Sequence, residues 1–264
     1  MRSVNSMGKK DSAARQSVDC EPDHLIWGVN AVTEALREPS HRVTAVRVEK
    51  GRGGERLQHL INLARERGVA VDFVNCGCLG VTRGISHQGV AALLGPVPCL
   101  TFDALLADLE ESKGASILAL DALQDPRNVG SILRSALAAG FRHVLMTRKR
   151  SVPLTGTVAR TSAGALAHLK ISQVTNMSNA LAALKEAGYW IYGAVVEPEA
   201  EPVYTADFGG RVCLVLGGEA KGIRPLVRRQ CDHLITIPMQ ATFNSLNVAV
   251  AAGILMFEIN RRRH

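Results

Sequence analysis

Residues 213–223 are Cys-Leu-Val-Leu-Gly-Gly-Glu-Ala-Lys-Gly-Ile, an apolar run that passes into a double glycine and a carboxylate. The run predicts a buried strand, and the glycines after it would let a ligand approach the backbone closely. A plain turn between a strand and a helix would leave the same pattern. Because the spacing is not Gly-x-Gly-x-x-Gly and no P-loop lysine follows, the stretch disfavours dinucleotide and triphosphate binding.

Short apolar strands alternate with helices around this stretch. The expected strands span residues 117–120, 143–147, 170–174, 190–196, 211–216 and 233–237, and the clearest helices span 128–139 and 179–187. This alternation predicts an α/β fold whose mostly parallel sheet is covered by helices on both faces. Ligand sites in such sheets lie at the carboxyl ends of the strands, which is where residues 217–219 would be.

A smaller α/β unit precedes this domain. Residues 30–36 and 56–67 are expected to be helical, and residues 43–48, 69–74 and 90–94 to be strands. The segment Gly95-Pro96-Val97-Pro98 then interrupts the pattern as a stiff linker. We therefore divide the chain into a disordered tail (1–22), a small domain (23–95), a linker (96–100) and a large domain (101–264). The tail is polar and lacks the apolar core of a secretory signal.

The charge of the chain favours a polyanionic partner. The formal net charge is +7, with basic clusters at residues 148–150, 221–229 and 261–263. A basic surface that meets only solvent is the alternative, but clustered lysine and arginine attract phosphates. Aromatic residues make up only 4% of the chain, so an RNA partner would be gripped chiefly through its phosphates and folded shape.

The cysteines bear on metal binding and on compartment. They lie at positions 20, 76, 78, 99, 213 and 231 and form no Cys-x-x-Cys pair. This spacing disfavours a structural zinc site. A reduced, cytoplasmic protein is the simplest interpretation.

Residues 121–136 form a second junction between a strand and a helix. Asn128 is a natural N-cap for the helix expected to begin there. Arg134 lies six residues further along, among apolar neighbours. A guanidinium in a largely buried helix needs a partner, and a phosphate that reaches the start of the helix would serve.

A third junction precedes the final helix, which is expected over residues 245–262. Pro238 ends a strand, Ser245 is a natural N-cap, and Asn247 follows within the first turn. Residues 248–257 are all apolar, counting alanine and glycine, and these ten residues are too few to span a membrane. A helix that is apolar all round must be buried all round. The sheet can cover one side, and either more of the core or a second subunit the other.

Together the three junctions resemble the three motifs of the SpoU/TrmH family of RNA ribose 2′-O-methyltransferases, which is part of the SPOUT superfamily. The motifs occur in the family's order, and the resemblance covers about residues 24–264. It looks closest to the RlmB-like group, which methylates a guanosine of 23S ribosomal RNA. The small domain, with Ile-Trp-Gly-Val-Asn-Ala-Val at 26–32 and His-Gln-Gly at 87–89, resembles ribosomal protein L30e. Transfer-RNA members typified by TrmH lack that domain. Asn244 departs from the small residue that many members carry.

The resemblance implies an α/β trefoil-knot (SPOUT) methyltransferase domain with a parallel sheet, preceded by the L30e-like RNA substrate-binding domain. It also implies a homodimer with the last helix at the interface. The methyl donor would be S-adenosylmethionine, bound in the knot largely through backbone groups. Carried over onto this sequence, the cofactor-binding residues are Gly217, Gly218, Ile237, Met239 and Leu246.

Methyl transfer to a ribose hydroxyl requires the oxygen to be held in line with the methyl while its proton is removed. The resemblance places Arg134 at that hydroxyl. Because arginine is essentially always protonated, we expect it to clamp the adjacent phosphate and stabilise charge on the oxygen. The residues expected to position Arg134, the RNA and the cofactor are Asn128, Glu219, Ser245 and Asn247. No metal is expected.

The candidates for RNA contact are Arg148, Lys149, Arg150, Arg224 and, in the small domain, His87. Two alternatives stay open. One is a 2′-O-methyltransferase that acts on transfer RNA, against which the L30e-like domain speaks. The other is a non-catalytic protein that binds ribosomal RNA or assists ribosome assembly on the same scaffold, against which the intact motif residues speak.

Overall fold

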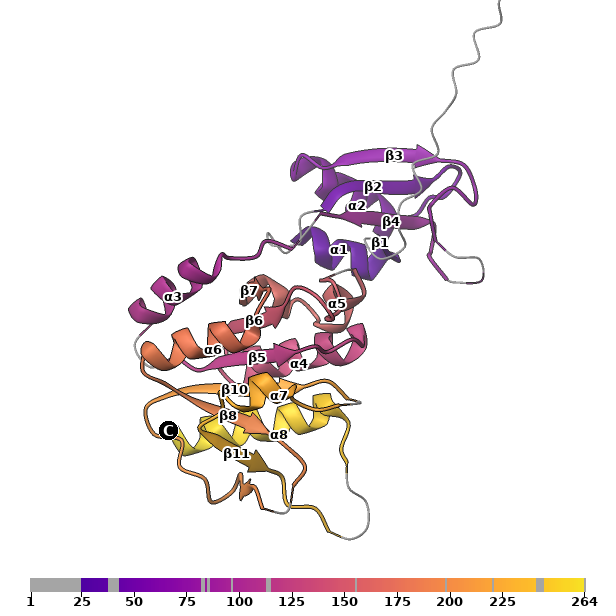
Figure 1. The fold of residues 1–264 in the computed structure, drawn as a ribbon. Helices are drawn as coiled ribbons and strands as arrows, with labels where there is room; N and C mark the ends of the chain where they lie inside the picture. The colour runs from indigo at the N-terminus through magenta and orange to yellow at the C-terminus, as the bar shows by residue number, and fades with distance from the viewer. Residues whose placement is uncertain are drawn as a thin grey trace, which may run out of the picture.

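The structure, a computed structural model, describes residues 25–37, 43–81, 84, 86–95, 97–112, 115–154, 156–197, 199–219, 221–240 and 245–263. Two α/β domains follow each other along the chain and are joined by an extended segment (Figure 1). The predicted tail of residues 1–22 lies outside the described residues. Within the described ranges, no helix has both the length and the apolar character needed to cross a bilayer.

The small domain is built on a four-stranded sheet in the order β1-β4-β2-β3. β2 and β3 are parallel and the other neighbours antiparallel. Its elements are β1 (Leu25–Trp27), α1 (Val29–Arg37), β2 (Val43–Glu49), α2 (Glu55–Glu66), β3 (Ala70–Val74) and β4 (Val90–Leu94). Val32 and Leu36 of α1 and Leu60 of α2 bury the apolar faces of the two helices against the sheet. The sequence did not predict β1, because three residues are too short to show a strand pattern.

The large domain has, among the described residues, a seven-stranded sheet in the order β7-β6-β5-β10-β8-β11-β9, with every neighbouring pair parallel. The strands are β5 (Ile117–Asp121), β6 (His143–Thr147), β7 (Lys170–Val174), β8 (Tyr189–Ala194), β9 (Glu201–Pro202), β10 (Arg211–Gly217) and β11 (His233–Thr236). β10, the strand with which the sequence analysis began, lies between β5 and β8. The predicted parallel sheet is therefore confirmed.

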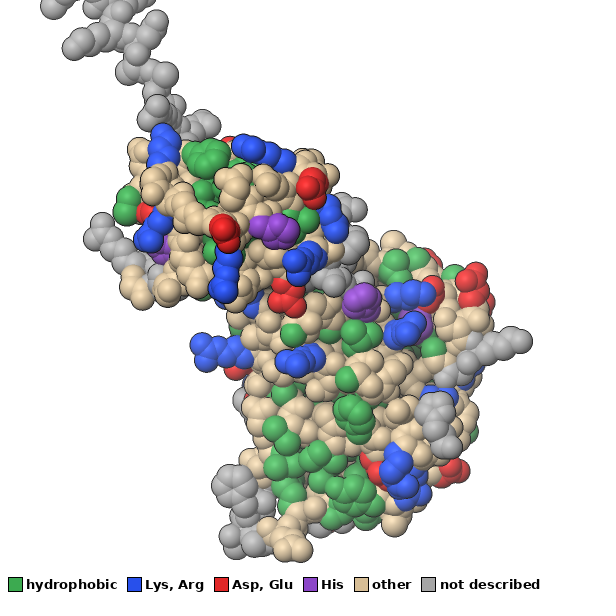
Figure 2. All heavy atoms as spheres, turned by 180° about the vertical axis from the view of Figure 1, so that it is seen from behind, with side chains coloured by type: hydrophobic (Ala, Val, Ile, Leu, Met, Phe, Trp, Pro, Cys, Tyr) green, Lys and Arg blue, Asp and Glu red, His purple; other side chains and the backbone are tan. Residues whose placement is uncertain are grey.

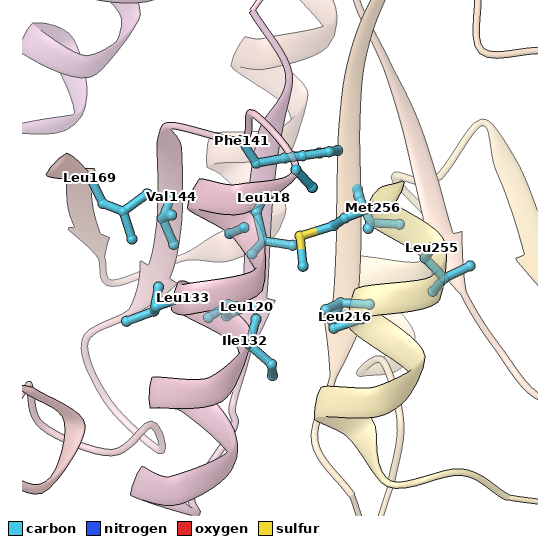
Figure 3. Close-up of a cluster of buried hydrophobic side chains, with 14 of the residues drawn as sticks. Leu118, Leu120, Ile132, Leu133, Phe141, Val144, Leu169, Leu216, Leu255 and Met256 are labelled. Carbon is cyan, nitrogen blue, oxygen red and sulfur yellow. The ribbon is translucent and has the colours of Figure 1, made fainter. Parts of the chain in front are cut away.

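Helices cover both faces of this sheet. One face carries α4 (Pro126–Ala138), α5 (Gly156–Thr161) and α8 (Val248–Arg263), and the other carries α3 (Phe102–Glu111), α6 (Met177–Glu186) and α7 (Pro225–Arg228). Figure 3 shows α4 and α8 side by side, with Leu133 and Met256 among the side chains that fill the space above Leu118 and Leu216 of the sheet. Burial on both faces explains why the strands are almost continuously apolar.

The final helix is covered on one side only. Ala252, Leu255 and Met256 of α8 are buried against the sheet and α4. On the opposite side, Val250 is 52% exposed and Phe257 is 51% exposed. The all-round apolar character of the helix is thus only half explained by the fold of a single chain.

Candidate functional site

A cavity of about 330 Å³ opens at the carboxyl ends of β8, β10 and β11, beside the start of α8. It lies at the edge of the sheet at which the sequence predicts the site. Every predicted cofactor-binding residue lines it, and so do Glu219 and Ser245. The cofactor-binding residues are Gly217, Gly218, Ile237, Met239 and Leu246.

The double glycine is required by space rather than by backbone angle. A Cβ on Gly217 would lie 2.1 Å from the carbonyl carbon of Gly222, and a Cβ on Gly218 would lie 2.8 Å from the carbonyl oxygen of Ala122. The chain folds back on itself here, and the amide of Gly222 donates to the carbonyl oxygen of Gly218 at 2.8 Å. Gly222 itself has a φ of +60°, the left-handed region that glycine adopts readily. The backbone of this loop therefore forms part of the cavity wall.

A buried ion pair anchors the same loop to β5. The Asp121 side chain is fully buried and accepts hydrogen bonds from the backbone amide of Arg224 at 3.1 Å, from its Nε at 2.9 Å and from its Nη2 at 2.5 Å. These bonds satisfy a carboxylate that would be costly to bury alone. No role for Asp121 could be predicted, because nothing local in the sequence points to a partner so far along the chain. Arg224 was expected to contact RNA, which stays a prediction, but its guanidinium is bound to Asp121.

Three polar side chains, one from each motif, form a chain of hydrogen bonds at the mouth of the site. Asn247 Nδ2 donates to Asn128 Oδ1 at 3.0 Å, and Asn128 Nδ2 donates to Glu219 Oε1 at 2.9 Å. Asn247 Oδ1 accepts from the backbone amide of Ala249 at 2.9 Å. Because that bond fixes which end of the Asn247 amide is the donor, it also fixes the orientation of the Asn128 amide.

Two of the predicted helix caps are wrong. α4 begins at Pro126, and Asp125 is its N-cap, accepting from the amide of Arg127 at 2.7 Å. Asn128 lies inside the helix because proline at the first position loses no hydrogen bond and moves the start forward. α8 begins at Val248, with Asn247 rather than Ser245 as its cap. The first correction removes the capping explanation from Asn128 and leaves its contacts with Glu219 and Asn247.

Replacing Asn247 separates capping from the contact with Asn128. Asn247→Ala should destabilise the protein by about 1 kcal/mol, since α8 loses its N-cap. Asn247→Ser retains a cap of similar strength, but its side chain is shorter and does not reach Asn128. We therefore expect the serine variant to unfold in urea like the wild type and to lose activity as the alanine variant does. Equal activity of the serine variant and the wild type would exclude a role for the contact.

Arg134 lies on the exposed side of α4, six residues beyond Asn128, and does not line the cavity. The expectation that the helix buries it is wrong, because α4 turns Val129, Ile132 and Leu133 toward the core and Arg134 away from it. Among the described residues, its guanidinium has no hydrogen-bond or ion-pair partner. It is thus available to an anionic ligand.

The other RNA-contact candidates are divided between the domains. Residues 148–150 are exposed and directly follow β6, at the same edge of the sheet as the cavity. His87 lies in the small domain, where its Nδ1 accepts from the amide of Gly89 at 3.1 Å. Within the described ranges, no three His, Cys, Asp or Glu side chains gather closely enough to hold a metal ion.

The contribution of β8 to the cavity was not predicted from the sequence. The last residue of that strand, Ala194, and the three residues after it line the wall together with Arg228. Glu197 and Arg228 form an ion pair in which both guanidinium Nη atoms donate to the carboxylate. These hydrogen bonds lower the pKa of the Glu197 carboxyl. The position of residues 194–197 at the carboxyl end of a predicted parallel strand was the available signal.

Comparisons with known proteins agree with this geometry. The model of the SpoU rRNA Methylase family matches residues 115–257, and the model named "RNA 2'-O ribose methyltransferase substrate binding" matches residues 25–98. A 23S rRNA (guanosine-2'-O-)-methyltransferase RlmB of Xylella fastidiosa is 43% identical over 90% of this chain and 96% of its own. The protein of the same name from Xanthomonas axonopodis is 41% identical over the same shares.

A solved structure shows the same fold. The SpoU methyltransferase AviRb from Streptomyces viridochromogenes, crystallised with AdoMet, superimposes with a TM-score of 0.76 over 91% of this chain and 90% of its own, at 22% identity. The predicted architecture, a SPOUT domain preceded by a small α/β domain, is confirmed. With a family model that spans more than half of it and relatives above 40% identity, the chain belongs to the SpoU rRNA methylase family of RNA methyltransferases.

Proposed function

We propose that this chain transfers the methyl group of S-adenosylmethionine to the 2′-hydroxyl of a guanosine in 23S ribosomal RNA. The observation that carries the proposal is that residues of the second and third motifs line one cavity, while Asn128 of the first motif is hydrogen-bonded both to Glu219 of the cavity wall and to Asn247. The relatives that share the small domain as well as the catalytic domain, at 41% and 43% identity, are named for this reaction.

The cavity suits the methyl donor. Its volume of about 330 Å³ lies within the range of ligand pockets, and its apolar wall, which includes Leu216, Ile237 and Leu246, can take a purine ring. The bare backbone at Gly217 leaves room that a Cβ would fill. Of the two carboxylates at the cavity, Glu197 is neutralised by Arg228, and Glu219, which accepts from the uncharged amide of Asn128, is the one that favours a sulfonium cation. When bound, the donor supplies a methyl group activated by that positive sulfur.

The side chains at the site orient the RNA and one another, and they stabilise the negative charge that develops on the 2′-oxygen. Arg134 is placed to hold the phosphate next to the target ribose through a forked pair of hydrogen bonds and to stabilise negative charge on the 2′-oxygen. Asn128 orients Glu219, and Asn247 orients Asn128, so the mouth of the cavity is preorganised before RNA arrives. Arginine is a poor base at neutral pH, so Arg134 acts by binding rather than by removing the proton.

The proposal is tested by supplying labelled methyl donor with two RNA substrates. Unmodified 23S ribosomal RNA and unmodified transfer RNA are incubated separately with the protein, and the labelled ribose is mapped. We expect label at one guanosine of the ribosomal RNA and none in transfer RNA. Label found only in transfer RNA would mean that transfer RNA is the substrate. Binding of ribosomal RNA without any label would mean that the protein is a non-catalytic RNA-binding protein. A ribosomal substrate would also imply the cytoplasmic location expected from the cysteines.

We assign part of the RNA binding to residues 148–150, which are exposed beside the site. Such contacts act through phosphates, so the affinity for ribosomal RNA should fall steeply as salt rises. The small domain would hold the RNA at a distance from the reacting ribose, in keeping with the substrate-binding model that matches it.

We also propose that the protein is a dimer with the exposed side of α8 at its interface. Val250 and Phe257 lie seven residues apart, on one side of the helix, and both are about half exposed. Figure 2 shows hydrophobic side chains gathered on the catalytic domain in the view from behind. A second copy that presents the same patch would cover them.

Charges placed on this side of α8 should separate the two copies. We expect Val250→Glu combined with Phe257→Glu to sediment as a monomer where the wild type sediments as a dimer, because a dimer would bury the new carboxylates. Leu226→Glu is the matched control, since this side chain is 64% exposed on α7, which covers the opposite face of the sheet. A wild type that sediments as a monomer at micromolar concentration would contradict the proposed dimer.

A further inference from the structure

One guanidinium joins the two domains. Arg160 of α5 has its Cζ 4.1 Å from the centroid of the Trp27 ring, which belongs to β1 of the small domain. Its Nη1 donates to the carbonyl oxygen of Leu25 at 3.1 Å, and its Nη2 donates to Oγ1 of Thr157 at 3.1 Å. Arg160 thus combines a cation–π contact with directed hydrogen bonds, which the ammonium of lysine reproduces only in part.

The helix that carries Arg160 is tied to the helix that carries the site. α5 packs on α4 at Gly130, where a Cβ would lie 1.8 Å from Oγ1 of Thr161. That same oxygen lies 3.3 Å from the carbonyl oxygen of Pro126, the first residue of α4. Since such close packing leaves no room for sliding, the position of Arg160 is fixed relative to Asn128 and Arg134 on α4.

The boundary between the domains is incompletely packed beside Arg160. A cavity of about 190 Å³ lies beside Arg160, lined by Ile26, Ala35 and Leu94 of the small domain and by Ala159 and Ala163 of the large one. The only covalent connection is the segment of chain between β4 and α3. Figure 1 shows the small domain adjoining the large one at α5. Apolar packing that leaves such a void does not by itself fix one orientation of the two domains.

We propose that Arg160 is a positioning residue for the reaction. Its contacts with Trp27 and Leu25 hold the substrate-binding domain in one orientation relative to α4, so that RNA bound by that domain presents its target ribose at the cavity. Without the contact, RNA that engages both domains must first fix their orientation, so it binds the enzyme more weakly. This inference rests on the proposed function.

Kinetics test the role in positioning. We expect Arg160→Met to raise the KM for a 23S ribosomal RNA fragment by about tenfold, the equivalent of losing one favourable contact. The affinity for S-adenosylmethionine, measured by calorimetry without RNA, should stay unchanged. Arg160→Lys should lie between the wild type and the methionine variant. Arg142→Met removes an exposed positive charge at the opposite, amino-terminal end of β6 and should behave as wild type.

Variants of Trp27, the residue that Arg160 contacts, provide an independent test. Trp27→Leu should raise the KM for RNA as Arg160→Met does, and the double variant should have no larger effect than either single change. Additive effects would mean that the two side chains act separately and would overturn the proposal. A loss of donor affinity in Arg160→Met would do so too, because it would indicate a general structural role.

A second readout does not depend on RNA. The chain has 2 tryptophans, so in a Trp190→Phe background the fluorescence reports on Trp27 alone. We expect Arg160→Met to change that emission and to broaden the distances between the domains in small-angle X-ray scattering. Unchanged emission and scattering would overturn the contact itself, and a KM within twofold of wild type would overturn its role. If the wild type methylates no RNA, the proposed function fails, while the emission still decides whether Arg160 holds the domains together.

Discussion

Arg134→Lys is expected to lower kcat by about 10²–10³ while the affinity for S-adenosylmethionine stays within twofold, because lysine keeps the charge but loses the forked geometry. The side chain is exposed on α4, six residues beyond Asn128, and no partner among the described residues holds it. Its removal should therefore leave the fold intact, and urea unfolding should be unchanged. Single-turnover measurements with saturating RNA would separate the methyl-transfer step from RNA binding.

The control for Arg134→Lys is Arg142→Lys, which makes the same change on an exposed arginine at the far end of β6. It should leave kcat unaltered. Near-full turnover of Arg134→Lys would mean that a point charge suffices and that the two-pronged phosphate clamp is wrong. An equal loss in both variants would point instead to a general dependence on surface arginine.

Gly217→Ala is expected to abolish binding of S-adenosylmethionine and to destabilise the protein by about 3 kcal/mol or more. The new methyl would lie 2.1 Å from the carbonyl carbon of Gly222 and 2.2 Å from the amide nitrogen of Ile223, both backbone atoms that cannot rotate away. The loop would have to open, and with it the wall of the cavity and the bonds between Arg224 and Asp121. Calorimetry with the donor and urea unfolding measure the two effects.

Gly209→Ala is the matched control for this change. Gly209 lies in a loop without a positive φ, and the nearest atom to an added Cβ is Oδ1 of Asp207 at 3.5 Å, an ordinary contact. The control should bind the donor normally and be as stable as the wild type. If Gly217→Ala bound the donor with wild-type affinity, the close approach of the loop would not be what shapes the cavity.

The cavity could be predicted from the sequence because parallel strands share a direction. Once β10 and β11 are predicted as strands of one parallel sheet, their carboxyl ends must lie at the same edge, and Gly217 and Ile237 both line the cavity there although β8 separates the two strands. The motif resemblance added Leu246 from the start of α8. The sequence could predict that Asn128, Glu219 and Asn247 belong to one site, but not which of them are hydrogen-bonded to each other. The partner of an amide side chain depends on the positions of loops that are distant in the sequence.

The remaining features depend on contacts that leave no local pattern. Asp121 and Arg224 are 103 positions apart, so neither spacing nor periodicity pairs them. The caps were misplaced because each junction offers competing polar side chains within a few residues, and the fold selects Asp125 and Asn247. The cation–π contact between Arg160 and Trp27 joins separate domains and has no sequence signature at all.

The insertion of β10 between β5 and β8 has a consequence for biosynthesis. Every strand pair of the small domain's sheet forms within residues 25–94. In the large domain, by contrast, β10 is synthesised about a hundred residues after β5, the strand with which it pairs. On the ribosome, the module that recognises substrate can therefore mature long before the reaction centre, which needs α8 to emerge from the exit tunnel. A chain that stops before the final helix would lack Val248 and Leu255 of the cavity wall, so the cavity is complete only once that helix has been made.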